Sequence, residues 1–153
     1  MEEHGAVLNR FLVDVFNEIL KTEELCLAGT YRDLSLREFH LIEEVCRAAV
    51  EGRDNRATAI AAAQRVTAGT LTTAVTLLEK KGYLERRRDE KDRRVVRILP
   101  TEKAFRAEAR HAEFHQEMVE HVLSALTSEE TEVFTRALGS VADFFHRKYG
   151  ENV

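Results

Sequence analysis

The sequence predicts a mainly α-helical fold with one small β-hairpin wing: a winged helix-turn-helix with long N- and C-terminal dimerisation helices. Apolar residues recur at three- and four-residue steps through most of the chain, two short helical segments lie in tandem near position 65, and a basic hairpin follows them. The length of 153 residues fits one domain-sized unit. We expect a single domain over 1–153, with the winged helix-turn-helix at 33–100 and dimerisation helices at 1–32 and 101–153.

The N-terminal segment predicts a helix with one apolar stripe. Its apolar residues recur at helical spacing: Leu8, Phe11, Leu12, Val15, Phe16 and Ile19. Ser35 and Glu38 then form a capping box, in which the hydroxyl and the carboxylate each bind an otherwise unsatisfied backbone N–H. This box predicts a helix to about Arg47, and the stretch Gly-Arg-Asp-Asn at 52–55 breaks the chain after it.

Two short helices with a tight connection come next, as is typical of a helix-turn-helix. The first is expected at about 58–64 and the second at about 68–81. Thr67 is the N-cap of the second helix, and Gly82 stands where a left-handed C-terminal residue belongs.

A polar tip between two β-prone runs predicts the hairpin. The runs are 83–88 and 93–99, the tip is Asp-Glu-Lys-Asp at 89–92, and Pro100 ends the second strand. Thr101 then caps a long helix to about Ser124, and a second capping box at 127–130 opens a last helix to about Lys148. A helix-turn-helix followed directly by a basic hairpin, the wing, is a winged helix.

The two C-terminal helices are too apolar to stand alone. Their stripes are Phe114, Met118, Val122 and Leu126 on the first, and Phe134, Leu138, Val141, Phe144 and Phe145 on the second. Such faces are buried within the chain or against a second copy. We expect a homodimer, because a two-fold partner also doubles the contacts with DNA.

The second short helix has two chemically different faces. Leu71, Val75 and Leu78 fall together at 100° per residue and are expected to face the core. The opposite face carries Gly69, Thr72, Thr73, Thr76 and Lys80. Threonine and glycine are poor helix formers, so this face has no stability rationale, but it suits a helix in the major groove. A threonine hydroxyl binds base or phosphate acceptors and its methyl contacts thymine, while glycine permits close approach.

The charge distribution also points to nucleic acid. The chain has a net charge of −4, but residues 80–97 hold nine basic and four acidic residues, so this segment carries +5 and the remainder −9. A basic stretch on an acidic body is typical of a local electrostatic binding site. We therefore expect double-stranded DNA as a partner.

Other classes of function find little support in the sequence. There is no Gly-rich phosphate loop and no spacing typical of a nucleophilic triad, so we expect no enzyme activity and no cofactor. The longest apolar run, 59–63, is far shorter than the roughly 20 residues of a membrane span, and no signal-peptide pattern precedes it. We expect a cytoplasmic protein with free thiols and no membrane partner.

Three motifs resemble the MarR family of winged-helix regulators, and the resemblance covers essentially the whole chain. They are LEKKGYLER at 78–86, DEKDRR at 89–94 and TEK at 101–103. The resemblance implies that Arg94 enters the minor groove and that Asp92 holds it in place, which fits the attraction of narrow minor grooves for arginine. Pro100 and Ala104 depart from the usual Leu and Gly of the family, at the junction of wing and helix. The expected DNA-binding residues are Thr67, Gly69, Thr70, Thr72, Thr73, Thr76, Lys80, Arg86, Arg88, Asp92, Arg93 and Arg94.

A narrower set of stretches is similar to the branch of that family that represses fatty-acid synthesis genes in Gram-positive bacteria. They are TEEL at 22–25, LSLREFH at 34–40, GTLTT at 69–73 and HQEMVE at 115–120. This similarity implies a repressor that responds to long acyl chains on acyl carrier protein. The apolar residues expected to line a pocket for the chain are Phe11, Val15, Phe16, Ile19, Phe39, Ile42 and Val45.

Three other effectors stay open. One is a small aromatic ligand, and one is zinc, because His111 and His115 are four residues apart on one helix with Glu108 and His121 nearby. For this pair we favour a solvated or interhelical histidine pair without metal, since no second ligand set is evident. The third is thiol oxidation at Cys26, whose neighbours Glu23 and Glu24 disfavour a reactive thiolate.

Overall fold

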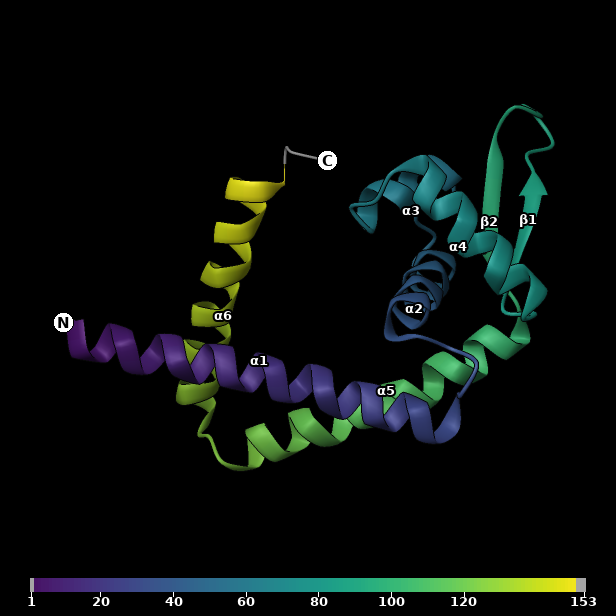
Figure 1. Cartoon of the computed structure of the whole chain (residues 1–153). Helices are drawn as coiled ribbons and strands as arrows, with labels where there is room; N and C mark the ends of the chain where they lie inside the picture. Colours follow the sequence, from purple (N-terminus) through teal and green to yellow (C-terminus); the bar gives the residue numbers. More distant parts are fainter. Residues whose placement is uncertain (1, 151–153) are drawn as a thin grey trace. The chain divides into compact units, whose positions relative to one another are not determined.

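The computed structural model describes residues 2–150 and divides into two compact units, residues 2–41 and residues 42–150. The first unit holds α1 (Glu2–Thr30) and the beginning of α2 (Leu36–Val50), and the second holds the rest of α2 and all later elements (Figure 1). These are α3 (Ala57–Ala63), α4 (Ala68–Lys80), β1 (Leu84–Arg88), β2 (Val96–Pro100), α5 (Glu102–Ser124) and α6 (Ser128–Tyr149). The predicted fold class, mainly helical with one small β-hairpin, is confirmed.

Four helices, α2, α4, α5 and α6, begin directly after the predicted capping residues. The backbone N–H of Ser35 donates to Glu38 Oε2 over 2.8 Å, and the reciprocal bond to Ser35 Oγ is 3.3 Å. Thr127 and Glu130 form the second capping box before α6, with bonds of 2.8 and 3.2 Å. Thr67 and Thr101 cap α4 and α5. These short polar motifs set the helix starts because they satisfy N–H groups that the helix itself leaves without partners.

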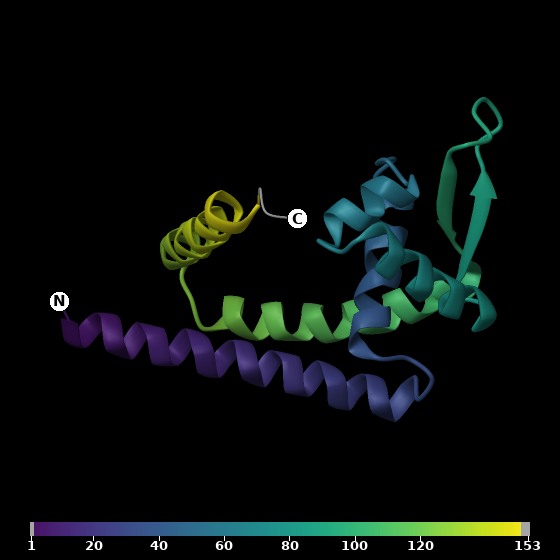
Figure 2. The same ribbon diagram turned by 45° about the horizontal axis from the view of Figure 1, so that its top comes forward.

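The helix-turn-helix packs around apolar side chains from α3, α4 and the hairpin. Leu71, Val75 and Leu78 of α4 are buried, as their spacing predicts, together with Ile60 of α3 and Ile98 of β2. Gly82 follows Lys81, the C-cap residue of α4, and has a φ of +80°, which is the left-handed conformation expected there. Figure 2 shows α4 beside the base of the hairpin, whose tip extends beyond the helices of this unit.

The hairpin tip is longer than predicted. β1 pairs antiparallel with β2 from Leu84 opposite Pro100 to Arg88 opposite Val96. The second strand therefore starts at Val96 and not at Arg93, and Pro100 is its last residue. Aspartate carboxylates cause the difference: Asp89 accepts the N–H groups of Lys91 and Asp92, and Asp92 accepts that of Arg94. These bonds hold the tip as a turn in place of ladder pairing.

Many apolar side chains of the terminal helices α1 and α6 are exposed to solvent in the single chain. No described residue of α6 is buried, and Phe134, Leu138, Phe144 and Phe145 are exposed. In α1, exposed apolar residues include Leu8, Phe11 and Phe16. None of the described helices is long and apolar enough to span a membrane.

Candidate nucleic-acid interface

α4 presents its small polar residues to solvent, as predicted. Gly69, Thr70, Thr72 and Thr73 are exposed, and Lys80 is exposed at the other end of the helix. The Thr73 hydroxyl donates to the carbonyl of Gly69 over 3.2 Å, so its methyl group and a lone pair remain for a ligand. This surface offers both polar and methyl contacts of the kind that base edges in a major groove accept.

Arg86 fixes the hairpin to α4 through four hydrogen bonds. Its backbone N–H donates to Glu79 Oε1 over 2.8 Å, and its Nη1 forms an ion pair with Glu79 Oε2. Its Nη2 donates to the carbonyl of Thr72 over 2.7 Å and to Thr76 Oγ1 over 2.9 Å. The Thr76 hydroxyl also donates its one proton to the carbonyl of Thr72 over 2.8 Å. We call this set, Glu79, Arg86, Thr72 and Thr76, the wing clamp.

The wing clamp gives two of the predicted DNA-binding residues a structural role, and their contact with DNA stays a prediction. Arg86 and Thr76 are half-buried, and Arg86 Nη2 donates to Thr76 Oγ1. Glu79 was missed by the sequence reasoning. The sequence shows only that an acidic residue near the end of the helix lies seven positions before an arginine in the next strand.

Arg94 lies at the tip of the wing with its side chain 92% exposed. The Asp92 carboxylate accepts bonds from its Nε over 3.1 Å, from its Nη2 over 3.2 Å and from its backbone N–H over 3.0 Å. These bonds lower the pKa of Asp92, chiefly through the side chain of Arg94. A carboxylate thus holds an extended arginine in the geometry that the resemblance implies, and its entry into a groove stays a prediction.

Asp89 organises the base of the tip and was not predicted as a site residue. It accepts from Arg97 Nε over 2.6 Å as well as from two backbone N–H groups. Arg97 donates in turn to Asn55 Oδ1 over 2.8 Å. The Arg97 bond, followed by the backbone bonds, lowers the pKa of Asp89 to about 2. An aspartate at a hairpin tip is a turn signal that the sequence could have supplied.

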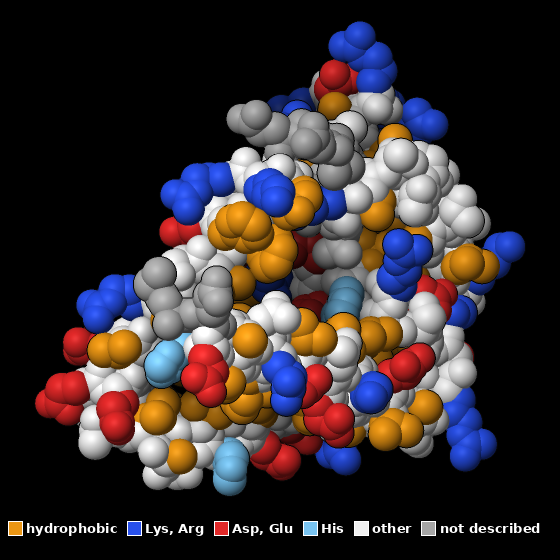
Figure 3. Space-filling model, turned by 60° about the vertical axis from the view of Figure 1, so that its left-hand side comes forward, with side chains coloured by type: hydrophobic (Ala, Val, Ile, Leu, Met, Phe, Trp, Pro, Cys, Tyr) orange, Lys and Arg blue, Asp and Glu red, His pale blue; other side chains and the backbone are white. Residues whose placement is uncertain are grey.

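Basic side chains surround this framework. Arg88 donates to the carbonyl of Arg93 over 3.1 Å, and both residues are exposed. Figure 3 shows lysine and arginine side chains at the top of the molecule, where the hairpin tip lies.

Arg65 adds an exposed cation in the turn between α3 and α4, with a left-handed φ of 52° that is unusual for a residue with a side chain. No pattern in the sequence indicates this conformation.

The residues predicted to line a ligand pocket fall into two groups. Phe11, Val15 and Phe16 are exposed and Ile19 is half-buried, whereas Phe39, Ile42 and Val45 are fully buried. Within residues 2–41 there is a cavity of about 280 Å³ to which none of the seven contributes. Its lining includes Glu24, Arg32 and Ser35. The predicted lining of an acyl pocket is therefore not brought together within either unit by itself, and it stays a prediction.

The thiols and one acidic residue have distinct surroundings. Cys26 and Cys46 are both free, as expected. Cys26 is exposed, whereas burial, aided by Glu108 and Glu43, raises the pKa of Cys46 to about 12 and so makes this thiol unreactive. In the first unit, Glu23 is buried with its Oε2 3.8 Å from Nε2 of His40.

Comparisons with known proteins agree with this geometry. The sequence model of the MarR family matches residues 52–96, which include α3, α4 and most of the hairpin. An uncharacterised HTH-type transcriptional regulator of Bacillus subtilis, YwhA, is 34% identical over 71 residues, which are 46% of this chain and 51% of YwhA. The matched part thus spans about half the length of that curated relative.

Solved structures extend the likeness to nearly the whole chain. FabT of Streptococcus pneumoniae, solved in complex with DNA, superposes with a TM-score of 0.85 at 34% identity and covers 93% of this chain and 97% of FabT. MepR of S. aureus, also solved with DNA, superposes with a TM-score of 0.70 at 20% identity over 90% of this chain and 97% of MepR, which supports the fold. Since FabT is matched along almost its full length, the chain belongs to the MarR family.

Proposed function

We propose that the chain is a sequence-specific DNA-binding transcriptional repressor of the bacterial cytoplasm. The observation that carries this proposal is the pairing of two exposed surfaces in residues 42–150. One is the threonine and glycine face of α4, and the other is Arg94, held at the wing tip by Asp92. α4 would enter the major groove, where its face reads base edges, while Arg94 enters the adjacent minor groove. FabT, solved with DNA, supports this use of the fold.

The repressor would act as a homodimer. The exposed apolar residues of α1 and α6 give each subunit surfaces that a second copy can bury, and burial contributes about 25 cal/mol per Å² of apolar surface. A two-fold dimer presents two copies of α4, which fit half-sites about one helical turn apart on a pseudo-palindromic operator.

Selection of duplexes from a random pool by the full chain tests this proposal. We expect enrichment of a pseudo-palindrome, bound by two chains for each duplex. Enrichment of a single short site bound by one chain would contradict the dimer, and no enrichment would contradict sequence-specific binding.

For the regulated genes and the effector, we propose fatty-acid synthesis genes and a long acyl chain presented by acyl carrier protein. The likeness to FabT and the similarity of the four stretches at 22–25, 34–40, 69–73 and 115–120 support this assignment. The apolar residues of α1 and α2 suit an alkyl chain, which gains about 0.8 kcal/mol per buried methylene. An acyl chain changes DNA binding only if it binds one arrangement of the two recognition helices better than another.

The effector is tested by operator affinity with acyl carrier protein that carries long or short acyl chains. We expect the affinity to change with the long chains and to stay constant with the short chains and with the unacylated carrier. If chain length has no effect, the acyl assignment is wrong and the DNA-binding assignment is untouched.

A further inference from the structure

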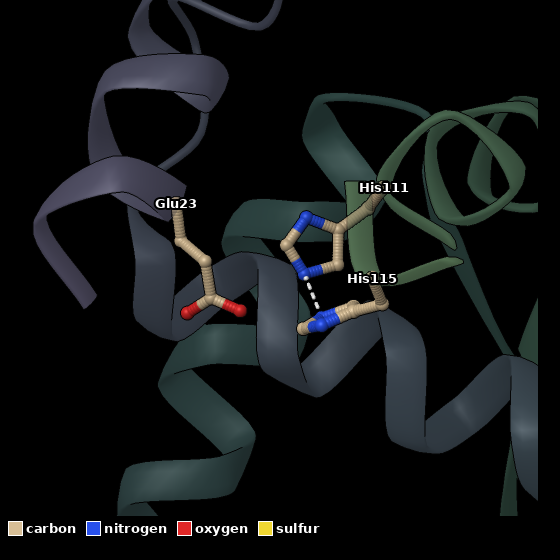
Figure 4. Close-up of side chains that lie close together, drawn as sticks. All are labelled: Glu23, His111 and His115. Carbon is tan, nitrogen blue, oxygen red and sulfur yellow. Dashed lines mark hydrogen bonds between the residues drawn. The ribbon is translucent and has the colours of Figure 1, made fainter. Parts of the chain in front are cut away.

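Two histidines of α5 converge on one point. His111 and His115 lie four residues apart, and their Nε2 atoms are 2.8 Å from each other. Their rings meet edge to face with centroids 4.4 Å apart, and Figure 4 shows the two imidazoles facing each other from the same helix. Both residues belong to the unit of residues 42–150 and need no other part of the chain to meet.

Of the two metal-free arrangements that the sequence favoured, solvated or interhelical, the surroundings of this pair fit the interhelical one better. His111 is only 6% exposed, and His115 is half-buried. The ring of Phe114 lies with its centroid 6.0 Å from that of His111 and 5.3 Å from that of His115. An apolar neighbour beside converging imidazoles limits the access of water, which strengthens interactions of the ring nitrogens with a cation.

The spacing of the two nitrogen atoms is close to that of a chelate. Zinc binds histidine nitrogen at about 2.0–2.1 Å, so two imidazoles on a tetrahedral ion are separated by about 3.3 Å. The Nε2 atoms at 2.8 Å reach this separation through small changes in side-chain torsion. Two histidines at i and i+4 on a helix are a known zinc-binding arrangement, and imidazole favours transition metals over magnesium or calcium.

We propose that His111 and His115 are the imidazole half of a site for a divalent transition-metal ion, with Zn²⁺ as the expected occupant. Each Nε2 donates its lone pair to the ion, so in the bound state each neutral ring carries its one proton on Nδ1. Water or further oxygen and nitrogen donors take the remaining positions of the tetrahedron. The site lies on α5 and shares no residue with the proposed DNA contacts of α4 and the wing.

The test is metal binding by the full chain, freed of metal and titrated with Zn²⁺ in competition with a chromophoric chelator. We expect one ion per chain, and at least a tenfold weaker affinity in His115→Gln and in His111→Asn, which retain a polar side chain. His121→Ala is the matched control, because His121 is an exposed histidine of the same helix and its loss is expected to leave the affinity unchanged.

Two measurements keep the proposal falsifiable if a variant folds poorly. Circular dichroism shows whether each variant retains its helices, and X-ray absorption of the zinc-loaded native chain counts imidazole ligands directly. At least two imidazoles are expected. Binding that is equally strong in the folded His115→Gln variant, or a native site without imidazole ligands, would overturn the proposal.

Discussion

Glu79→Gln tests the wing clamp, because the structure and simple charge arguments predict opposite signs. Glu79 is an acid beside the proposed DNA surface, so charge alone predicts that its neutralisation strengthens DNA binding. In the structure, however, Glu79 holds both the backbone N–H and the guanidinium of Arg86 and thereby fixes the wing on α4. We expect Glu79→Gln to weaken operator binding.

The magnitude follows from the contacts that are lost. The Glu79 and Arg86 side chains are 31% and 28% exposed, so their ion pair is partly screened by solvent. A hydrogen bond to a charged group contributes about 1.5–3 kcal/mol, and partial exposure reduces this to about 1–2 kcal/mol of unfolding free energy. Without the clamp, DNA binding must order each wing. If this costs about 0.7 kcal/mol of binding free energy per wing, the two wings of a dimer together lower the operator affinity about tenfold.

Glu85→Gln is the matched control for this experiment. Glu85 lies on β1 beside Arg86, and among the described residues it pairs only with Arg87, at 2.9 Å on an exposed surface. Its neutralisation removes the same charge and leaves the wing clamp intact, so operator affinity is expected to stay constant or rise. Fluorescence anisotropy with a labelled operator duplex at fixed salt measures both variants. If Glu79→Gln raises the affinity as Glu85→Gln does, the positioning role of the clamp is refuted.

Four further predictions concern the wing, the turn before α4 and the terminal helix. Arg94→Ala should weaken operator binding by about 1–3 kcal/mol per contact, and Asp92→Ala should weaken it by less. Fluorescence anisotropy measures both variants, and an affinity equal to that of the native chain in both would show that the wing tip makes no contact with DNA. Arg65→Ala should reduce the slope of log affinity against log salt by about 1 per phosphate contact, and an unchanged slope would remove Arg65 from the interface. Deletion of residues after Thr127 should give aggregated or monomeric protein with poor operator affinity. Light scattering measures the oligomeric state, and a monomer that still binds the operator would place dimerisation elsewhere. The Asp89 carboxylate, whose pKa lies at about 2 instead of 3.8, stabilises the wing tip above pH 3.8, and this contribution is lost as the pH falls toward 2. The amide resonances of Lys91 and Asp92 report this loss, and a transition complete above pH 3.8 would contradict it.

Local signals predicted most of the helices and their buried faces. The capping boxes at Ser35 and Thr127 and the left-handed Gly82 each act within a few residues, so the chain there follows its own short-range chemistry. The buried face of α4 followed from helical spacing alone. The pairing of Asp92 with Arg94 needed the resemblance to the MarR family.

The features that were missed depend on contacts between elements. Whether Arg86 faces DNA or α4 is decided by where the hairpin docks on that helix, which no local pattern reports. The start of β2 depends on which backbone N–H groups the Asp89 and Asp92 carboxylates capture in competition with the ladder. The burial of His111 likewise depends on packing around α5, and spacing alone could not separate it from a solvated pair.

The central claim is that the chain binds DNA through the basic wing and α4. Its most direct test is the affinity of the native chain for the selected operator and for a scrambled duplex, measured across a range of salt concentrations. We expect affinity for both to fall steeply with salt, because the basic residues of the wing displace counterions, and the operator to be preferred at every concentration. An affinity that stays flat with salt and equal for the two duplexes would contradict the claim.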